Sequence, residues 1–174
     1  KLVSPDVIHK TEIGGVRLNL GCAEELEEAA AEIRQRVTLS GARIDGWLVE
    51  EMADPGVEVV VGGLQDPEFG PLVMVGLGGI FVEIFKDISF RICPITRADA
   101  QDMVAELKSS PLLNGARGAE PLAVDALIDV ILRVGGEEGV LMTGQAHIAE
   151  LDINPLIVSR TGATAVDARF ILKQ

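Results

Sequence analysis

Apolar residues recur along the chain with two different periods, and these periods predict both helices and strands. Over residues 23–39, Leu26, Ile33 and Val37 recur at helical spacing, and glutamates occupy positions between them. Helix-start signals at Thr96 and Pro121 predict helices that run to about residue 109 and about residue 134. Apolar or alternating runs predict strands over residues 16–20, 44–52, 57–64, 72–77, 80–85, 89–95, 148–158 and 163–171, and the glycine-rich residues 135–144 predict a loop.

The order of these elements indicates an α+β protein. Strand pairs joined by short turns occur beside strand–helix alternation, which argues against a purely parallel doubly wound sheet. The Asp-Pro-Gly turn at residues 54–56 is the candidate domain boundary. We therefore expect a small lobe over residues 1–53 and a large lobe over residues 54–174. Because the chain begins at Lys1 directly on an apolar stretch, we expect that the upstream part of the small lobe is missing.

The last predicted strand pair places oxygen-bearing side chains on one face. Along the first strand Glu150, Asp152 and Asn154 alternate with aliphatic residues, so the three share a face. A four-residue turn over residues 159–162 would pair Val158 with Ala163 and would set Asn154 opposite Asp167. Opposed side chains in an antiparallel pair lie about 5 Å apart at Cβ, and two hard oxygen ligands at that separation can hold Mg²⁺. The alternative is that Asp152, Asn154 and Asp167 only form the solvated face of an edge hairpin.

Other segments offer weaker candidates for phosphate chemistry. His9, beside Lys10, could accept a phosphoryl group because neutral imidazole is nucleophilic; the alternative is an exposed surface histidine. A hinge that includes Glu50, Met52 and Glu58 could bind the amino group and ribose of a nucleotide, or these residues could simply be charged and exposed strand ends. The glycine turn at residues 76–79 could present backbone N–H groups to a phosphate, or be a plain tight turn, and Arg91 is the nearest candidate cation.

Composition and charge exclude several classes of function. The chain has 174 residues and 15 Lys+Arg against 27 Asp+Glu, a formal net charge of −12. A surface this acidic repels nucleic-acid phosphates and anionic membranes, so neither is expected as a partner. No apolar run is long enough for a membrane-spanning helix. Cys22 and Cys93 have no CxxC partner, which is typical of buried thiols in a reducing cytosol and predicts a cytoplasmic protein.

Several segments together resemble one family. Residues 1–16 (KLVSPDVIHKTEIGGV) and residues 150–156 (ELDINPL) are the most specific parts, and residues 57–58, 66–71, 76–79, 82–83 and 90–94 extend the match over nearly the whole chain. These motifs are similar to those of ADP-forming (NDP-forming) acyl-CoA synthetases. The resemblance implies an ATP-grasp fold of two α/β lobes with mixed sheets, like the β subunit of succinyl-CoA synthetase.

The resemblance also implies a reaction and a set of roles. A phosphoryl group would pass between a phosphohistidine, at His9, and ADP or ATP, coupled to cleavage or formation of an acyl-CoA thioester. Lys1 would contact nucleotide phosphates, Glu50 would lie at the adenine and ribose hinge, and Glu58 would face the nucleotide. The metal ligands for Mg²⁺ would be Asn154 and Asp167, with Asp152 nearby.

The implied enzyme is an acid–thiol ligase that needs a further part. A CoA-binding domain or α subunit would bring acyl-CoA and phosphate, and the intact enzyme would be an oligomer. One alternative is a non-catalytic, nucleotide-sensing regulatory module of a protein acyltransferase with the same fold. Another is an ATP-grasp ligase that phosphorylates a carboxylate directly and does not need His9.

Overall fold

The structure is a computed structural model that describes residues 1–7, 10–78 and 86–173. The predicted strand over residues 80–85 and the candidate His9 lie outside the described residues. The chain divides into two compact units, Lys1–Met52 and Ala53–Gln174. Each unit has its own hydrophobic core, so each is described by itself.

The first unit is one helix packed on a short strand pair. β1 (Leu2–Val3) pairs antiparallel with β2 (Gly46–Trp47), and α1 runs over Ala23–Ser40. Ile33 and Val37 of α1 are buried against Leu2, which confirms the helix and two residues of its predicted inner face. The helix ends at Gly41, whose φ of 75° is the left-handed conformation that commonly ends a helix.

Two strands predicted for this unit are wrong or shorter than expected. Residues 16–20 form no strand, and the expected strand over residues 44–52 is reduced to the two residues of β2. Asn19 adopts a φ of 59°, and this left-handed conformation interrupts an extended segment. Cys22 is exposed rather than buried, because it is the N-cap residue of α1 and the first residues of that helix, 23–25, are all exposed.

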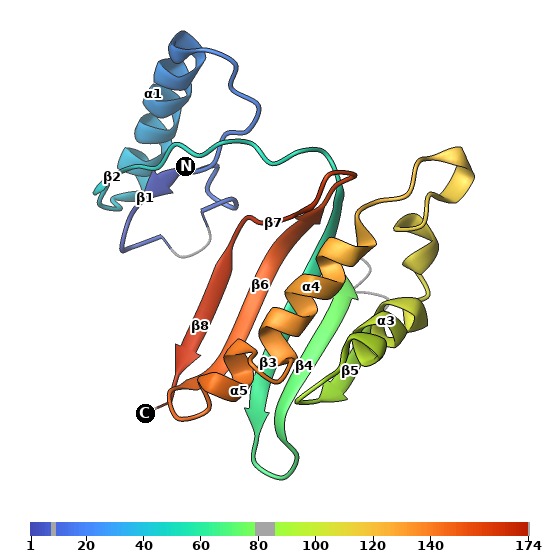
Figure 1. Cartoon of the computed structure of the whole chain (residues 1–174). Helices are drawn as coiled ribbons and strands as arrows, with labels where there is room; N and C mark the ends of the chain where they lie inside the picture. The colour runs from blue at the N-terminus through green and yellow to red at the C-terminus, as the bar shows by residue number, and fades with distance from the viewer. Residues whose placement is uncertain (8–9, 79–85, 174) are drawn as a thin grey trace. The chain divides into compact units, whose positions relative to one another are not determined.

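The second unit is an antiparallel sheet covered by helices on one face (Figure 1). Its central strands are β3 (Val57–Asp66), β4 (Gly70–Leu77) and β6 (Ile148–Val158), and β5 (Ile88–Ile92) lies at one edge. β7 (Ala163–Ala165) and β8 (Ala168–Leu172) both pair with β6 at the other edge. Every described strand pairing is antiparallel, where mixed sheets were expected, because β3, β4 and β5 are consecutive antiparallel neighbours and β6 returns antiparallel beside β3.

Three α-helices connect β5 to β6. They are α3 (Arg97–Glu106), α4 (Val124–Gly135) and the short α5 (Val140–Thr143), with single 3₁₀ turns at Ser110–Leu112 and Ala116–Gly118. α3 begins as predicted: the Thr96 side chain accepts the Asp99 N–H, and the Asp99 carboxylate accepts the Thr96 N–H. α5 replaces part of the loop expected over residues 135–144, because Leu141 is fully buried over β3. No helix in the described part of the chain is long and apolar enough to span a membrane.

Strand alternation divides the sheet into a helix-covered face and a face that we call the open face. Val59, Val61, Val73, Val75 and Leu151 are buried in the core with α3, α4 and α5. Their neighbours in sequence must point to the opposite side of the sheet. The open face therefore carries residues of the intervening positions, namely Glu58, Gly62, Met74, Phe90, Glu150, Asp152 and Asn154.

A bulge in β6 allows residues on both sides of it to face the core. Val61 pairs with Ile153, but Val59 pairs with Leu156, so Asn154 and Pro155 together face a single residue of β3. The extra residue changes the alternation, and Leu151 and Leu156 are both buried on the helix-covered face as a result. The bulge thus marks the position along β6 at which the candidate site residues lie.

Candidate functional site

The closing strands have the register that the sequence predicted. Val158 pairs with Ala163 and Ile153 pairs with Ala168. Between these pairs, the Asn154 N–H donates to the Asp167 carbonyl oxygen at 3.1 Å. Asn154 therefore lies opposite Asp167, as expected. The single strand predicted over residues 163–171 is wrong in one respect: it is split into β7 and β8 at residues 166–167, opposite the bulge in β6.

Asp152 lies two residues before Asn154 on β6 and shares the open face with it. Its Cα partners are Gly62 on β3 and Arg169 on β8. Gly62 has no side chain, and a Cβ added there would lie 3.8 Å from Asp152 Oδ1 and 3.4 Å from Met74 Cε. Gly62 is itself buried, so the Met74 side chain and the half-buried Asp152 side chain cover the backbone at this position. The missing side chain at Gly62 lets these two side chains pack close to the sheet.

The oxygen-bearing side chains on this part of the open face supply only some of the ligands that a hard divalent cation needs. Asp152 and Asp167 supply carboxylates, Asn154 supplies an amide oxygen, and one Asp167 oxygen accepts the Ala168 N–H at 3.0 Å. Within the described residues, no three His, Cys, Asp or Glu side chains gather into a metal-binding group. Mg²⁺ is commonly bound by one or two carboxylates, with phosphate oxygens and waters as its other ligands. The set fits a metal that arrives together with a nucleotide.

Glu58 also lies on the open face, near the start of β3. It is exposed and pairs with Ile157 of β6 across the sheet. Its carbonyl oxygen accepts the Gly78 N–H at 2.7 Å, and a Cβ added at Gly78 would lie 3.0 Å from the Glu58 Cβ. The absence of a side chain at Gly78 therefore leaves room for the Glu58 side chain beside the end of β4.

Arg91 does not join this group. It pairs with Val73 of the buried core, so its side chain lies on the helix-covered face. There Arg91 Nη1 donates to Glu106 Oε2 at 3.0 Å, and Ser89 Oγ donates to the same oxygen at 2.7 Å. The hydrogen bond to Glu106 raises the pKa of Arg91 above its ordinary value. The structure therefore separates Arg91 from the carboxylates by the thickness of the sheet, because the strand period puts it on the other side.

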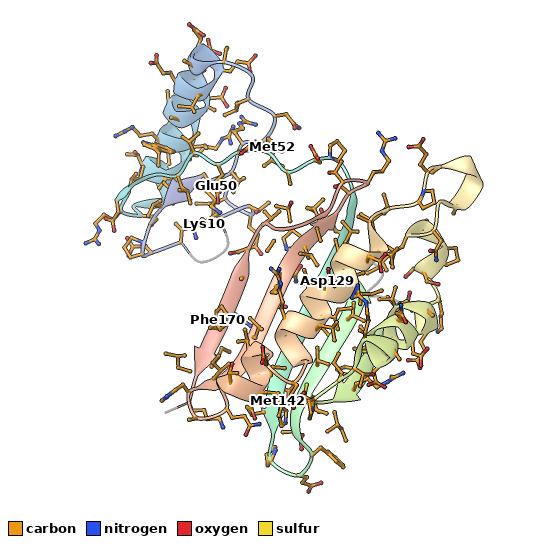
Figure 2. All side chains as sticks on the ribbon, viewed as in Figure 1. Lys10, Glu50, Met52, Asp129, Met142 and Phe170 are labelled. Atoms are coloured by element: carbon orange, nitrogen blue, oxygen red, sulfur yellow. The ribbon has the colours of Figure 1, made fainter. Side chains whose placement is uncertain are left out.

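Two nucleotide candidates of the first unit meet each other. Lys1 Nζ lies 2.8 Å from Glu50 Oε2, and both side chains remain partly exposed. Met52 is about half exposed, at 49%, and Figure 2 shows Glu50 and Met52 on the segment that follows β2. The ion pair arises because β1 begins beside the segment that leaves β2: the Leu48 N–H donates to the Lys1 carbonyl oxygen at 2.8 Å.

Sequence reasoning missed one charged residue of the open face, Arg169. It lies directly opposite Asp152 and two residues after Asp167. The signal was available, because the register that set Asn154 against Asp167 also sets Asp152 against Arg169. Nearness in sequence to a glycine turn favours Arg91, but it does not indicate the face of the sheet on which the side chain lies.

The comparisons with known proteins agree with this architecture. The model of the ATP-grasp domain family matches residues 1–172. The antiparallel sheet with an open, acid-bearing face is thus the sheet of an ATP-grasp protein, and the chain belongs to the ATP-grasp domain family.

Named relatives narrow the resemblance to one group of ligases. The chain is 47% identical over 174 residues to the β subunit of the ADP-forming acetate–CoA ligase I of Pyrococcus furiosus. This match covers 99% of this chain and 73% of that subunit. It is 46% identical to the ADP-forming acetate–CoA ligase I of Archaeoglobus fulgidus, of which it spans only 25%. Its relatives therefore include both separate subunits and much longer chains.

Solved structures show the same similarity. The chain matches the dinucleotide-forming acetyl-coenzyme A synthetase 1 of Ca. Korarchaeum cryptofilum in complex with coenzyme A and Ca-AMPCP, with a TM-score of 0.89 and 46% identity over 99% of this chain and 75% of that one. A second structure of that enzyme, with coenzyme A and Mg-AMPPCP, has its phosphohistidine segment pointing towards the nucleotide binding site. It matches with a TM-score of 0.85 and 44% identity, over 99% of this chain and 75% of that one.

Proposed function

We propose that this chain is the ATP-grasp part of an ADP-forming acyl-CoA synthetase. It would move a phosphoryl group between a phosphohistidine and ADP or ATP, coupled to cleavage or formation of an acyl-CoA thioester. In this proposal residues 1–53 belong to the small lobe and residues 54–174 form the large lobe. The observation that supports it most directly is the meeting of Asn154 and Asp167 on the sheet, with Asp152 beside them.

The proposed chemistry assigns a role to each group of residues. His9 would carry the phosphoryl group; transfer to ADP breaks its N–P bond and forms a P–O bond to the terminal phosphate of ADP. Asn154, Asp167 and Asp152 would hold Mg²⁺, which when bound neutralises phosphate charge.

The remaining candidates would contact the nucleotide itself. Lys1 would contact its phosphates, Glu50 and Met52 would contact its base and ribose, and Glu58 would face it from β3. We leave Arg91 out of the proposed site, because its side chain is engaged with Glu106 on the helix-covered face.

The proposal needs a second component. A CoA-binding domain or α subunit would form the acyl phosphate from acyl-CoA and phosphate and would pass the phosphoryl group to His9. The relatives support this division, because one of them is a subunit and another is about four times longer than the match. We propose that the intact enzyme is an oligomer of these parts.

Binding of Mg-ADP tests the metal site in the complete protein. Asp167→Asn should weaken Mg-ADP binding in calorimetry by about tenfold or more, because a lost contact to a charged ligand is worth about 1.5–3 kcal/mol. Asp125→Asn is the matched control, since Asp125 is 85% exposed on α4 and should bind Mg-ADP as the unchanged protein does. Equal affinities for both variants would contradict the metal assignment.

A labelling experiment tests the phosphoryl transfer. With acyl-CoA and ³²P-phosphate, the complete enzyme should acquire acid-labile label on this chain and pass it to ADP. His9→Ala should remove the label from this chain. A regulatory module would acquire none, and a ligase that phosphorylates carboxylates directly would form ATP without it, so this one assay separates the three functions.

A further inference from the structure

Arg169 is the cation that the register of β8 places at the candidate metal site. β8 pairs with β6 so that Arg169 faces Asp152 and Ala168 faces Ile153. Directly paired residues of antiparallel strands share a face, so the Arg169 side chain leaves the sheet on the open face beside Asp152. Its neighbour Phe170, labelled on β8 in Figure 2, pairs with the core residue Leu151 and so belongs to the other face.

The guanidinium of Arg169 is not engaged by the carboxylates beside it. In the described part of the chain, no nitrogen of Arg169 lies within ion-pair distance of an acid. Most other arginines of that part have such a partner, for example Arg97 with Asp129 at 2.7 Å and Arg43 with Asp45 at 2.8 Å. Arg169 is exposed, so its five N–H donors are available to a ligand.

Charge at the site calls for a cation in addition to the metal. A divalent ion balances the Asp152 and Asp167 carboxylates, but the charge of the nucleotide phosphates then remains. A guanidinium suits this task because its planar fork donates two parallel hydrogen bonds to phosphate oxygens. Within the described part of the chain, Arg169 is paired directly with Asp152 and lies two residues after Asp167.

We infer that Arg169 binds the phosphate chain of the nucleotide directly, from the β8 side of the metal. This inference rests on the proposed function, because it needs a nucleotide at the open face. Direct binding of phosphate by Arg169 can be distinguished by measurement from an indirect effect of Arg169 on the metal-binding carboxylates. A residue that binds phosphate supports nucleotide binding even without metal, whereas a cation beside two carboxylates opposes the binding of metal alone.

The test uses the complete protein with its CoA-binding domain or subunit. Arg169→Gln is compared with Lys173→Gln, which removes the same charge from the segment just beyond β8. Lys173 is exposed, and four residues of strand separate it from Arg169 by about 13 Å, beyond the screening length of about 8 Å at physiological salt. Calorimetry measures the affinity for Mg-ADP and for ADP in excess EDTA, and electron paramagnetic resonance measures the affinity for Mn²⁺ alone.

The expected pattern is specific. Arg169→Gln should weaken both Mg-ADP and metal-free ADP by about tenfold, as expected for one charged hydrogen-bonding contact, and should leave Mn²⁺ binding unchanged or tighter. Arg169→Lys should recover part of the loss, and Lys173→Gln should stay within about twofold of the unchanged protein.

Two results would overturn the inference. One is unchanged affinity of Arg169→Gln for ADP with and without metal. The other is a loss confined to Mg-ADP and accompanied by weaker Mn²⁺ binding, since the residue would then act on the metal ligands. If Asp167→Asn loses affinity for Mg-ADP while Arg169→Gln retains it, the proposed function stands and only this inference fails. If the unchanged protein binds no Mg-ADP, the proposed function itself fails.

Discussion

Asp87 holds the end of α3 through a buried carboxylate, and its removal should destabilise the second unit. Asp87 is only 5% exposed. Its oxygens accept the Lys108 N–H at 2.9 Å, the Ser109 N–H at 2.8 Å and the Ser109 hydroxyl. These donors directly follow Leu107, the C-cap residue of α3. The carboxylate therefore fixes the direction in which the chain leaves the helix.

The size of the effect follows from the donors that lose their acceptor. Asp87→Ala leaves two backbone N–H groups and one hydroxyl unsatisfied, and an unsatisfied buried donor costs about 1–3 kcal/mol. The Lys108 N–H is only partly buried and the hydroxyl can rotate, so we expect a total loss of about 3 kcal/mol in the free energy of unfolding. Ser109→Ala removes one hydrogen bond of the three and should lower it by about 1 kcal/mol.

The stabilisation should also depend on pH. Burial alone raises the pKa of Asp87, but the hydrogen bonds from Ser109 and Lys108 outweigh it, so the pKa lies below its ordinary value of 3.8. A carboxyl whose pKa is lowered by folding contributes stability above the unfolded pKa, and this contribution is lost as the pH falls through the folded pKa. The gap between the unchanged protein and Asp87→Ala should therefore be full at neutral pH and should narrow below pH 3.8.

Urea denaturation followed by far-ultraviolet circular dichroism measures these differences, at neutral pH and in acid. Asp87→Ala should unfold at distinctly lower urea than Ser109→Ala. The reasoning is refuted if the two variants lose equal stability, or if the deficit of Asp87→Ala is as large in acid as at neutral pH.

Two further predictions concern the core and the thiols. Ile131→Ala should lower the free energy of unfolding by about 2–5 kcal/mol, because Ile131 is fully buried on α4. Ile92→Ala should change the free energy of unfolding little, because Ile92 is 55% exposed. Similar losses for the two variants in denaturant titrations would contradict the assigned core. In the native protein at neutral pH, iodoacetamide should alkylate the exposed Cys22 and spare Cys93, because burial raises the pKa of the Cys93 thiol to about 11. Peptide mass spectrometry should find both labelled only after denaturation, and native labelling of Cys93 would count against its burial.

Local signals were sufficient for several elements of this protein. The alternation over residues 148–158 matches β6 at both ends, and the four-residue turn that follows sets Val158 against Ala163. The Thr96 capping box marks the start of α3. In each case the deciding interactions lie within a few residues of one another, so the sequence contains them.

Other features depend on partners that are distant in sequence. Leu141 lies in a glycine-rich stretch that predicts a loop, yet it is fully buried in the core, which favours α5. Residues 16–20 alternate like a strand, but Asn19 takes a left-handed conformation. Alternation alone does not supply a strand with a neighbour to bond.

What the sequence by itself determined was the pairing of Asn154 with Asp167, because a short turn and a period of two are sufficient to set the register of a hairpin. Only the tertiary structure decided which faces were used. The helices cover one side of the sheet, so Arg91 is engaged with Glu106 there while Arg169 lies beside Asp152 on the other side. A period of two states that neighbouring residues face opposite ways, but which face is buried depends on the elements that pack against the sheet.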